Sequence, residues 1–202
     1  MTKKFIAGLL LASLLTSFAA EQRIATIDLR KAFDKYWRTV QADANLKEQA
    51  ADLEKERKAM TDDFQKRQDS YRKTLDAAND PALSATERDR RKKQAEDDLL
   101  NLRATEDRIR QFDNTSRTTL GEKQRRVRDQ ILSEIKEKVK VKAKSGNYTM
   151  VLDTAAESVN NTPFLLYNGA TDNDLTDAVL GELNINAPKD LPKITEPGGS
   201  AK

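Results

Sequence analysis

The stretch Asn79-Asp80-Pro81-Ala82-Leu83-Ser84-Ala85-Thr86-Glu87 interrupts a long, highly charged region of the chain. Asn-Asp-Pro is typical of a turn, and the Ser-x-x-Glu spacing that follows is a capping box, which begins a new helix. Residues 41–144 around it contain 26 basic and 22 acidic side chains, with Pro81 as their one proline and Gly121 as their one glycine. Such a composition favours long, solvent-exposed helices. The sequence therefore predicts two long helices joined at residues 79–84.

Large apolar residues on the two sides of this turn mirror one another. If the helices fold into an antiparallel hairpin about residue 81 or 82, facing positions have numbers that sum to about 163. The mirrored pairs are Phe64 with Leu99, Met60 with Leu102, Leu53 with Ile109, Trp37 with Val127, Phe33 with Ile131, and Leu29 with Ile135. A random apolar distribution would not mirror itself, so we predict an antiparallel hairpin.

The predicted hairpin is long and its seam is thin. At about 1.5 Å per residue, a helix from Leu29 to Ala78 makes an arm of roughly 75 Å, which must project into solvent. Residues 115–121 (Thr-Ser-Arg-Thr-Thr-Leu-Gly) are mediocre helix formers. We expect a bend or a flexible point there, and arms that can splay.

Short apolar stretches flank the hairpin. Residues 22–28 before it and residues 148–153 after it are typical of β-strands, and Phe-Leu-Leu-Tyr at 164–167 predicts a third strand. A short helix over residues 175–183 follows, with Asp172 or Asn173 expected as its cap.

These flanking elements predict a small body that cannot close a core alone, because its exposed strand edges invite pairing with another chain. We therefore expect an oligomer held through body residues, namely Ile24, Ile27, Phe33, Trp37, Val151 and Leu165. The predicted fold class is mostly α with a small β body, from which a long antiparallel helical hairpin (a coiled-coil arm) projects. Residues 20–40 and 142–184 would form the body, 41–141 the arm, and 185–202 a disordered tail.

Composition excludes several kinds of chemistry. The 202 residues include no Cys and no His, so no thiol nucleophile, disulfide, imidazole base or Ser-His-Asp triad is available. The acidic cluster at 172–177 suggests a calcium loop, but Leu183 stands where the bidentate Glu belongs, which favours a helix cap. We predict no catalytic, cofactor-binding or metal-binding residues, and no enzyme activity.

The first 19 residues are typical of a cleaved secretory signal. Lys3 and Lys4 precede an apolar run over residues 5–15, and small residues lie at Ser17 and Ala19. The run is about half the length of the roughly 20 apolar residues that a membrane span needs, although a retained anchor stays as the alternative. Cleavage would leave a net charge of +1, and export without cysteine suits the bacterial periplasm. Nucleic acid is not an expected partner.

The order of these features resembles the Skp/OmpH-like family of periplasmic chaperones for outer-membrane proteins. The resemblance rests on the signal, the strand at 24–28 followed by Phe-Asp-Lys-Tyr at 33–36, the charged hairpin, and the stretches 148–153 and 174–180. It implies a homotrimer of jellyfish-like architecture, whose strands build a common β body and whose three hairpins surround a cavity. That cavity would hold an unfolded client without ATP, and no phosphate-binding Gly-x-x-x-x-Gly-Lys motif is present.

The arm carries four large apolar groups that are candidates for client contact: Met60, Phe64, Tyr71 and Phe112. Met60 and Phe64 have mirror partners, so packing within the seam is the alternative for both. Tyr71 falls opposite Lys92 and Phe112 falls opposite Ala51. These two are therefore the better candidates for contacting a client.

Cations gather just beyond the turn, at Arg88, Arg90, Arg91, Lys92 and Lys93. A run of charges usually marks a solvated face. The sharper hypothesis is that this patch attracts anionic lipid, lipopolysaccharide or acidic clients at long range, an effect that salt would screen.

The sequence favours a binding function. We expect an exported, ATP-independent holdase that binds unfolded outer-membrane β-barrel proteins in a cavity between the arms of an oligomer. The alternative is a structural coiled-coil spacer or tether of the cell envelope, without chaperone activity.

Overall fold

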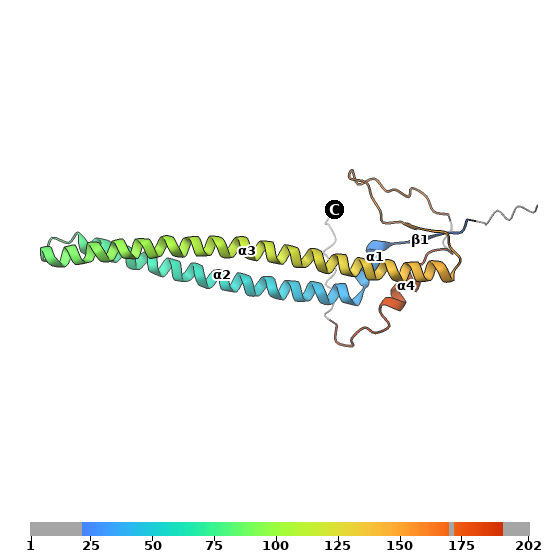
Figure 1. Ribbon diagram of the computed structural model, residues 1–202, viewed down its shortest axis with the longest axis horizontal. Helices are drawn as coiled ribbons and strands as arrows, with labels where there is room; N and C mark the ends of the chain where they lie inside the picture. Colours follow the sequence, from blue (N-terminus) through green and yellow to red (C-terminus); the bar gives the residue numbers. More distant parts are fainter. Residues whose placement is uncertain (1–21, 170–171, 192–202) are drawn as a thin grey trace, which may run out of the picture.

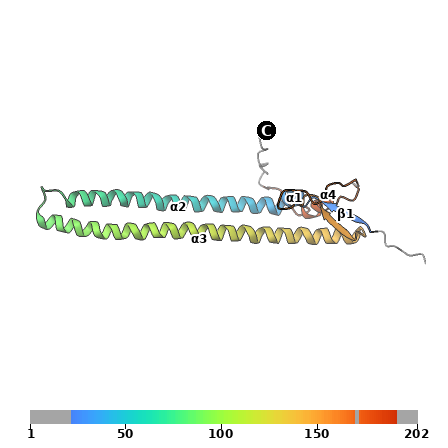
Figure 2. The ribbon, with the colours of Figure 1, turned by 90° about the horizontal axis from the view of Figure 1, so that it is seen from above.

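Figure 1 shows a computed structural model of the chain, which describes residues 22–169 and 172–191. The predicted signal sequence and the end of the predicted tail lie outside the described residues. Six elements follow one another: β1 (Ile24–Ile27), α1 (Leu29–Lys35), α2 (Trp37–Ala78), α3 (Ala85–Ser145), β2 (Met150–Asp153) and α4 (Thr176–Leu183). The helices α2 and α3 form a long antiparallel hairpin, and the perpendicular view in Figure 2 shows them side by side. The predicted mostly helical fold with a hairpin arm and a small β body is confirmed.

The turn of the hairpin has the chemistry that the sequence predicts. Ser84 caps α3, and its Oγ accepts a hydrogen bond from the N–H of Glu87 at 3.2 Å. The carboxylate of Asp80 accepts a hydrogen bond from the N–H of Ala82 at 2.8 Å, as in an Asx turn. Local side-chain bonds thus close the tip of the arm.

The register of the hairpin differs from the prediction. Hydrogen bonds across the seam join Gln49 to Lys123 and join both Tyr36 and Arg38 to Glu134, so the paired numbers sum to 170 to 172. Compared with a sum of about 163, the residue of α3 that faces a given residue of α2 lies seven to nine positions further along the chain, or about two helical turns. Figure 2 shows the reason: the first turn of α3 reaches past the end of α2, so the turn residues add length on one side only.

The helix predicted to start at Leu29 is broken at Tyr36, which has an extended backbone (φ −71°, ψ 126°) between α1 and α2. The side chain of Asn184, which follows α4, bonds both sides of this break. Its Oδ1 accepts from the N–H of Trp37 at 2.9 Å, and its Nδ2 donates to the C=O of Lys35 at 3.0 Å. The break therefore depends on a residue distant in sequence, which helical periodicity cannot reveal.

The helix α3 runs for 61 residues through the segment 115–121, where a bend or flexible point was expected. Neither Figure 1 nor Figure 2 shows a sharp bend there. Hydrogen bonding within a long helix is cooperative, so a short run of weak helix formers does not interrupt it.

The small sheet has two parallel strands, with Ile24 opposite Met150 and Ile27 opposite Asp153. The whole hairpin is the crossover between them. The prediction of a third strand at 164–167 is wrong, because those residues pair with no strand of the described chain. The outer edge of β1 is instead bonded by residues 173–175, through the N–H and C=O of Thr26.

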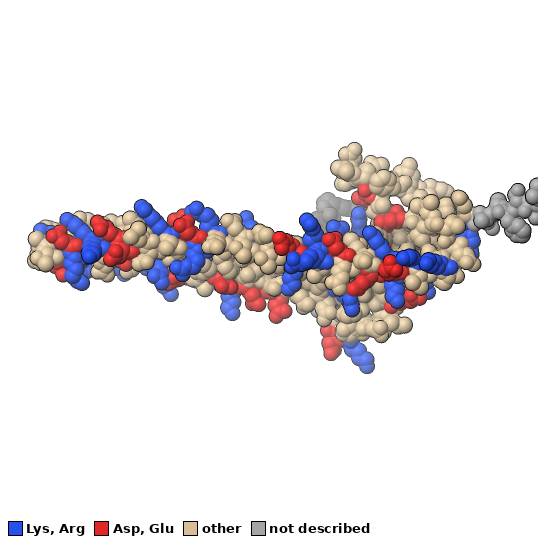
Figure 3. Space-filling model, viewed as in Figure 1, with Lys and Arg blue, Asp and Glu red and all other residues tan. Residues whose placement is uncertain are grey.

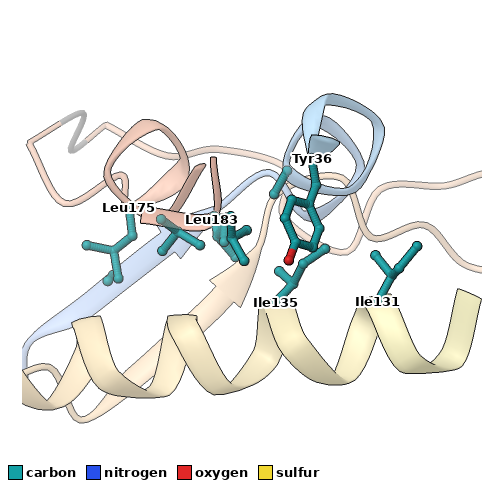
Figure 4. Close-up of a cluster of buried hydrophobic side chains, with 9 residues drawn as sticks. Tyr36, Ile131, Ile135, Leu175 and Leu183 are labelled. Atoms are coloured by element: carbon teal, nitrogen blue, oxygen red, sulfur yellow. The ribbon is translucent and has the colours of Figure 1, made fainter. Parts of the chain in front are cut away.

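The core lies where β1, α1 and α4 cover the base of α3. Its buried side chains are Ala25, Ile27, Ala32, Tyr36, Ile131, Ile135, Leu175, Val179 and Leu183. Figure 4 shows Ile131 and Ile135 pointing from α3 towards the body elements. The base of the arm, which the sequence analysis counted with the arm, thus supplies part of the core of the body.

The start of α4 also differs from expectation. Neither Asp172 nor Asn173 is its N-cap; that position belongs to Leu175, which makes no side-chain cap bond. The Asp174 carboxylate accepts from the N–H of Thr176 at 2.8 Å and takes over this function.

Candidate functional site

Three open grooves follow the seam between α2 and α3. The basal groove, of about 260 Å³, lies beside the body and is lined by Trp37, Val127 and Ile131. The middle groove, of about 230 Å³, has an apolar floor of Ala50, Leu53, Phe112 and Leu120. The outer groove, of about 290 Å³, has an apolar floor of Phe64, Tyr71, Leu99 and Leu102.

The grooves exist because the seam of the arm contains few large buried side chains. Within residues 41–126, Leu102 is the one large apolar residue that is buried, and the other buried positions are Thr74, Ala78, Ala95 and Thr105. Small side chains allow the helices to approach but do not fill the space beside aromatic neighbours. The larger seam residues are half-buried, so each keeps part of its apolar surface open to solvent.

The structure brings two of the predicted client residues together. Phe64 and Tyr71 line the outer groove with Leu99 and Leu102. The expectation that Tyr71 faces Lys92 and lacks an apolar neighbour is wrong. It rested on the predicted register, in which the numbers of facing residues sum to about 163. Phe64 and Tyr71 are seven residues apart, a coiled-coil spacing that would have placed both on the seam.

The other two predicted client residues lie elsewhere on the arm. Phe112 lines the middle groove with Leu53, so Ala51 is not its main neighbour there. Met60 is half-buried between the middle and outer grooves and lines neither of them. Sequence reasoning missed Leu120, which also lines the middle groove.

Acidic and basic side chains are equal in number at the rims of the basal and middle grooves, and one arginine of each groove is paired. In the basal groove, Arg38 lies 2.6 Å from Glu134. In the middle groove, Arg57 lies 2.6 Å from Glu54. The hydrogen bond to Glu54, and its negative charge with that of Asp113, raise the pKa of Arg57. These two rims are therefore close to electrically neutral.

The cationic patch beyond the turn is partly compensated by carboxylates. Arg90 and Arg91 both bond the carboxylate of Glu87, at 2.7 and 3.0 Å. The hydrogen bond from Arg90, reinforced by Arg91, lowers the pKa of Glu87 to about 2. Figure 3 shows acidic and basic groups interspersed along the arm. The arrangement favours a solvated network at the tip over a uniform cationic surface.

Two further cations of the tip, Arg88 and Lys92, have partners other than Glu87. The side chain of Arg88 donates to the C=O of Leu83 at 2.6 Å, and Lys92 lies 3.9 Å from Asp89. Lys93 has no ion-pair partner among the described residues.

The predicted oligomerisation residues occupy different places in the body. Ile27 is buried in the core of its own chain, whereas Ile24 is 41% exposed. Phe33, Trp37 and Val151 are half-buried against that core. Leu165 is half-buried in the loop that follows β2.

The same loop presents apolar side chains to solvent, which the sequence analysis did not identify as exposed. They are Val159, Phe164, Leu166 and Tyr167, of which the last three are between 74% and 84% exposed. Figure 1 shows this loop standing away from the rest of the body. Surface of this kind is typical of a protein interface.

The described residues contain neither a metal-binding cluster nor a membrane-spanning helix. No group of three or more acidic side chains among them is arranged to hold a metal ion. None of the described helices is long and apolar enough to cross a lipid bilayer.

The family model described as "Outer membrane protein (OmpH-like)" matches residues 23–183, from the start of β1 to the end of α4. The chain belongs to the OmpH-like family. A search of curated protein sequences found no match. The OmpH-like family is a family of periplasmic chaperones that bind outer-membrane proteins and are not known for enzymatic activity. Membership suggests a chaperone role for this chain towards outer-membrane proteins.

Proposed function

We propose that this chain is an exported, ATP-independent holdase, which binds unfolded outer-membrane β-barrel proteins and prevents their aggregation. The observation that supports this most is the row of apolar grooves along a solvent-exposed arm. Membership of the OmpH-like family supports the class of client.

Client binding would use many weak contacts in place of one tight site. Each groove leaves part of several apolar side chains exposed, and burying apolar surface is worth about 25 cal/mol per Å². A client side chain that enters one groove can leave it again at small cost, so the client stays bound overall while it remains unfolded. Such binding needs no nucleotide, because no step has to be driven.

Charge would keep the arms themselves soluble. Acidic and basic side chains alternate along the face of the arm in Figure 3, which disfavours contact between the apolar grooves of separate molecules. The tip cations support at most a secondary contact with anionic lipid or lipopolysaccharide, because four of the five already have partners.

We further propose that the chain acts as a homotrimer, with the client in a cavity between three arms. The exposed loop residues Phe164, Leu166 and Tyr167 provide apolar surface for contact between copies. Residues 20–40 and 142–184 would form the body, together with the base of α3, and 41–141 the arm. Residues 1–19 would be removed on export to the periplasm, and residues 185–202 would form a tail that is not needed for binding.

The test is whether the mature chain suppresses aggregation. An outer-membrane β-barrel protein unfolded in urea is diluted into buffer with the mature chain and without nucleotide, and light scattering is recorded. We expect scattering to fall as the chain approaches stoichiometric amounts, with no further effect of ATP. Unchanged scattering at every ratio would instead support a spacer or tether of the cell envelope.

A pair of neighbouring leucines provides a matched control. Leu99→Ser removes part of the floor of the outer groove, whereas Leu100 is 62% exposed and lies outside that groove. The Leu99→Ser variant should require more protein for the same suppression, and Leu100→Ser should behave like the unmodified chain. Circular dichroism of both variants checks that the arm remains helical.

A further inference from the structure

Charge distinguishes the outer groove from the other two grooves. Arg72 of α2 and Arg103 of α3 lie at its rim, one on each helix. Neither guanidinium has an ion pair with any described residue. The one acid in the lining, Glu106, is held by Arg110 at 3.2 Å. Two arginines of this rim thus remain without a carboxylate partner.

The two other grooves show that this is not a general feature of the arm. Arg38 of the basal groove and Arg57 of the middle groove each bond a carboxylate of the same groove, at 2.6 Å in both cases. The middle groove also contains Arg117, which has no ion pair among the described residues, but two carboxylates in the same lining, Glu54 and Asp113, match its two arginines in number. An arginine already bonded to a carboxylate has fewer free N–H donors and less uncompensated charge with which to bind a ligand. The outer groove therefore combines an apolar floor with two unpaired guanidinium groups and no unpaired carboxylate, a combination that neither the basal nor the middle groove has.

This combination defines the chemistry of a fitting ligand. Aromatic and large aliphatic side chains fit a floor of Phe64, Tyr71, Leu99 and Leu102. A guanidinium group pairs with carboxylates through two parallel hydrogen bonds and is more weakly hydrated than an ammonium group. In an extended chain, residues i and i+2 point to the same side and lie about 6.5 to 7 Å apart. A carboxylate two residues from a side chain in the floor would therefore be directed towards the rim.

We propose that the outer groove selects client segments in which an aromatic or large aliphatic side chain lies two residues from a carboxylate. The inference rests on the proposed function, and it names the class of client segment that this groove binds. Arg72 and Arg103 are the residues that give the groove this selectivity, and Phe64 and Tyr71 provide the apolar contact.

Two labelled peptides test the proposal on the full mature chain. One carries Asp two residues before and two residues after a central Phe in a Gly/Ser background, and the other carries Lys at both places. Fluorescence anisotropy at low salt gives the Kd of each. We expect the Asp peptide to bind about tenfold more tightly, which corresponds to two exposed charge contacts. The difference should shrink as salt is added.

Charge reversal on the protein provides the decisive comparison. The double variant Arg72→Glu/Arg103→Glu should prefer the Lys peptide, because a merely structural role for the arginines would not reverse the preference. The matched control is Arg108→Glu/Arg125→Glu, two arginines of α3 that lie outside the three grooves and have no ion pair among the described residues. This control should keep the preference for the Asp peptide.

The outcomes that overturn the proposal are distinct from failure of the proposed function. Equal affinity for both peptides, no detectable binding of either, or an equal change in both double variants would overturn it. So would loss of binding to vesicles of anionic lipid in Arg72→Glu/Arg103→Glu with unchanged peptide affinities, since the arginines would then contact membrane. If the unmodified chain still suppresses β-barrel aggregation in any of these cases, the holdase function stands and only the selectivity is wrong.

Discussion

Tyr36 illustrates how a single side chain joins the arm to the body. It is 5% exposed, and its hydroxyl donates a hydrogen bond to Glu134 of α3 at 2.9 Å. Arg38, the second residue of α2, bonds the other oxygen of the same carboxylate at 2.6 Å. Burial, together with the hydrogen bond to Glu134 and its charge, raises the pKa of Tyr36 to about 12. The contact at the base of the arm is therefore sensitive to alkaline pH.

The raised pKa of Tyr36 predicts a loss of stability at high pH. The unfolded chain would ionise this tyrosine near its ordinary pKa of about 10, before the folded chain does. The stabilisation is therefore complete below about pH 10 and is lost as pH rises towards 12, by up to about 2 kcal/mol. Urea unfolding between pH 8 and 11.5 should show a steeper decline for the unmodified chain than for Tyr36→Phe. Parallel declines would mean that Tyr36 ionises equally easily in both states.

Asn184 is the second residue on which the base of the arm depends. Asn184→Ala removes the bonds to Trp37 N–H and to the C=O of Lys35. We expect a loss of about 1 to 2 kcal/mol in the free energy of unfolding, because the partly buried N–H of Trp37 loses its partner, whereas the exposed C=O of Lys35 can bond water. Asn186→Ala, at an exposed position two residues later, should change it by less than about 0.5 kcal/mol. Chemical denaturation of both variants decides whether Asn184 stabilises the break, and equal effects would argue against it.

At the scale of elements, α3 is the structural axis of the molecule. Its first turn forms the tip, its middle forms the seam with α2, and its last turns carry the core residues Ile131 and Ile135. Because one continuous helix serves all three regions, its rigidity determines how the arm is held relative to the body.

Gly121 allows the continuity of α3 to be tested. A Cβ at this position would have no heavy atom from outside its own stretch of helix backbone within 4 Å among the described residues, so Gly121→Ala adds no clash. We expect a gain of about 0.5 to 1 kcal/mol in stability and slightly higher helicity, since glycine is a poor helix former. Gly146→Ala is the contrasting change, because its Cβ would clash with the ring of Tyr148 unless that ring moves. Thermal unfolding followed at 222 nm compares them, and a loss of stability in Gly121→Ala would show that a bend at this site is needed.

The sequence predicted those elements whose causes are local. The Ser84 cap and the Asp80 turn rest on residues a few positions apart, so both could be identified without the fold. The register could not be identified, because it depends on how far α3 extends past α2. The break at Tyr36 depends on Asn184, and the segment 164–167 has strand-like composition but no strand partner in its own chain.

The sequence identified several residues of the candidate site, but it did not predict how they are grouped in space. Phe64, Tyr71 and Phe112 do line grooves, yet the grouping of Phe64 with Tyr71 follows from the observed register. The free arginines of the outer groove could not be separated from the many other cations of the arm by composition. Only the contacts show that Arg38 and Arg57 are paired while Arg72 and Arg103 are not.

At the scale of the whole molecule, the stabilising contacts are concentrated in the body and are few along the arm. A compact core joins β1, α1, α4 and the base of α3, whereas most of the arm is stabilised by helix propensity and a thin seam. A molecule of this kind has a firm base and an arm with exposed apolar grooves. This uneven distribution suits a protein that must hold clients of varied sequence and release them again.

The central claim is that an oligomer of this chain holds an unfolded outer-membrane protein between its arms without nucleotide. The most direct test is the mass, by analytical ultracentrifugation, of the mature chain mixed with a urea-diluted β-barrel protein and no ATP. The account predicts one soluble species with the mass of three chains and one client. A chain that sediments as a monomer, with the client pelleted as aggregate, would contradict it.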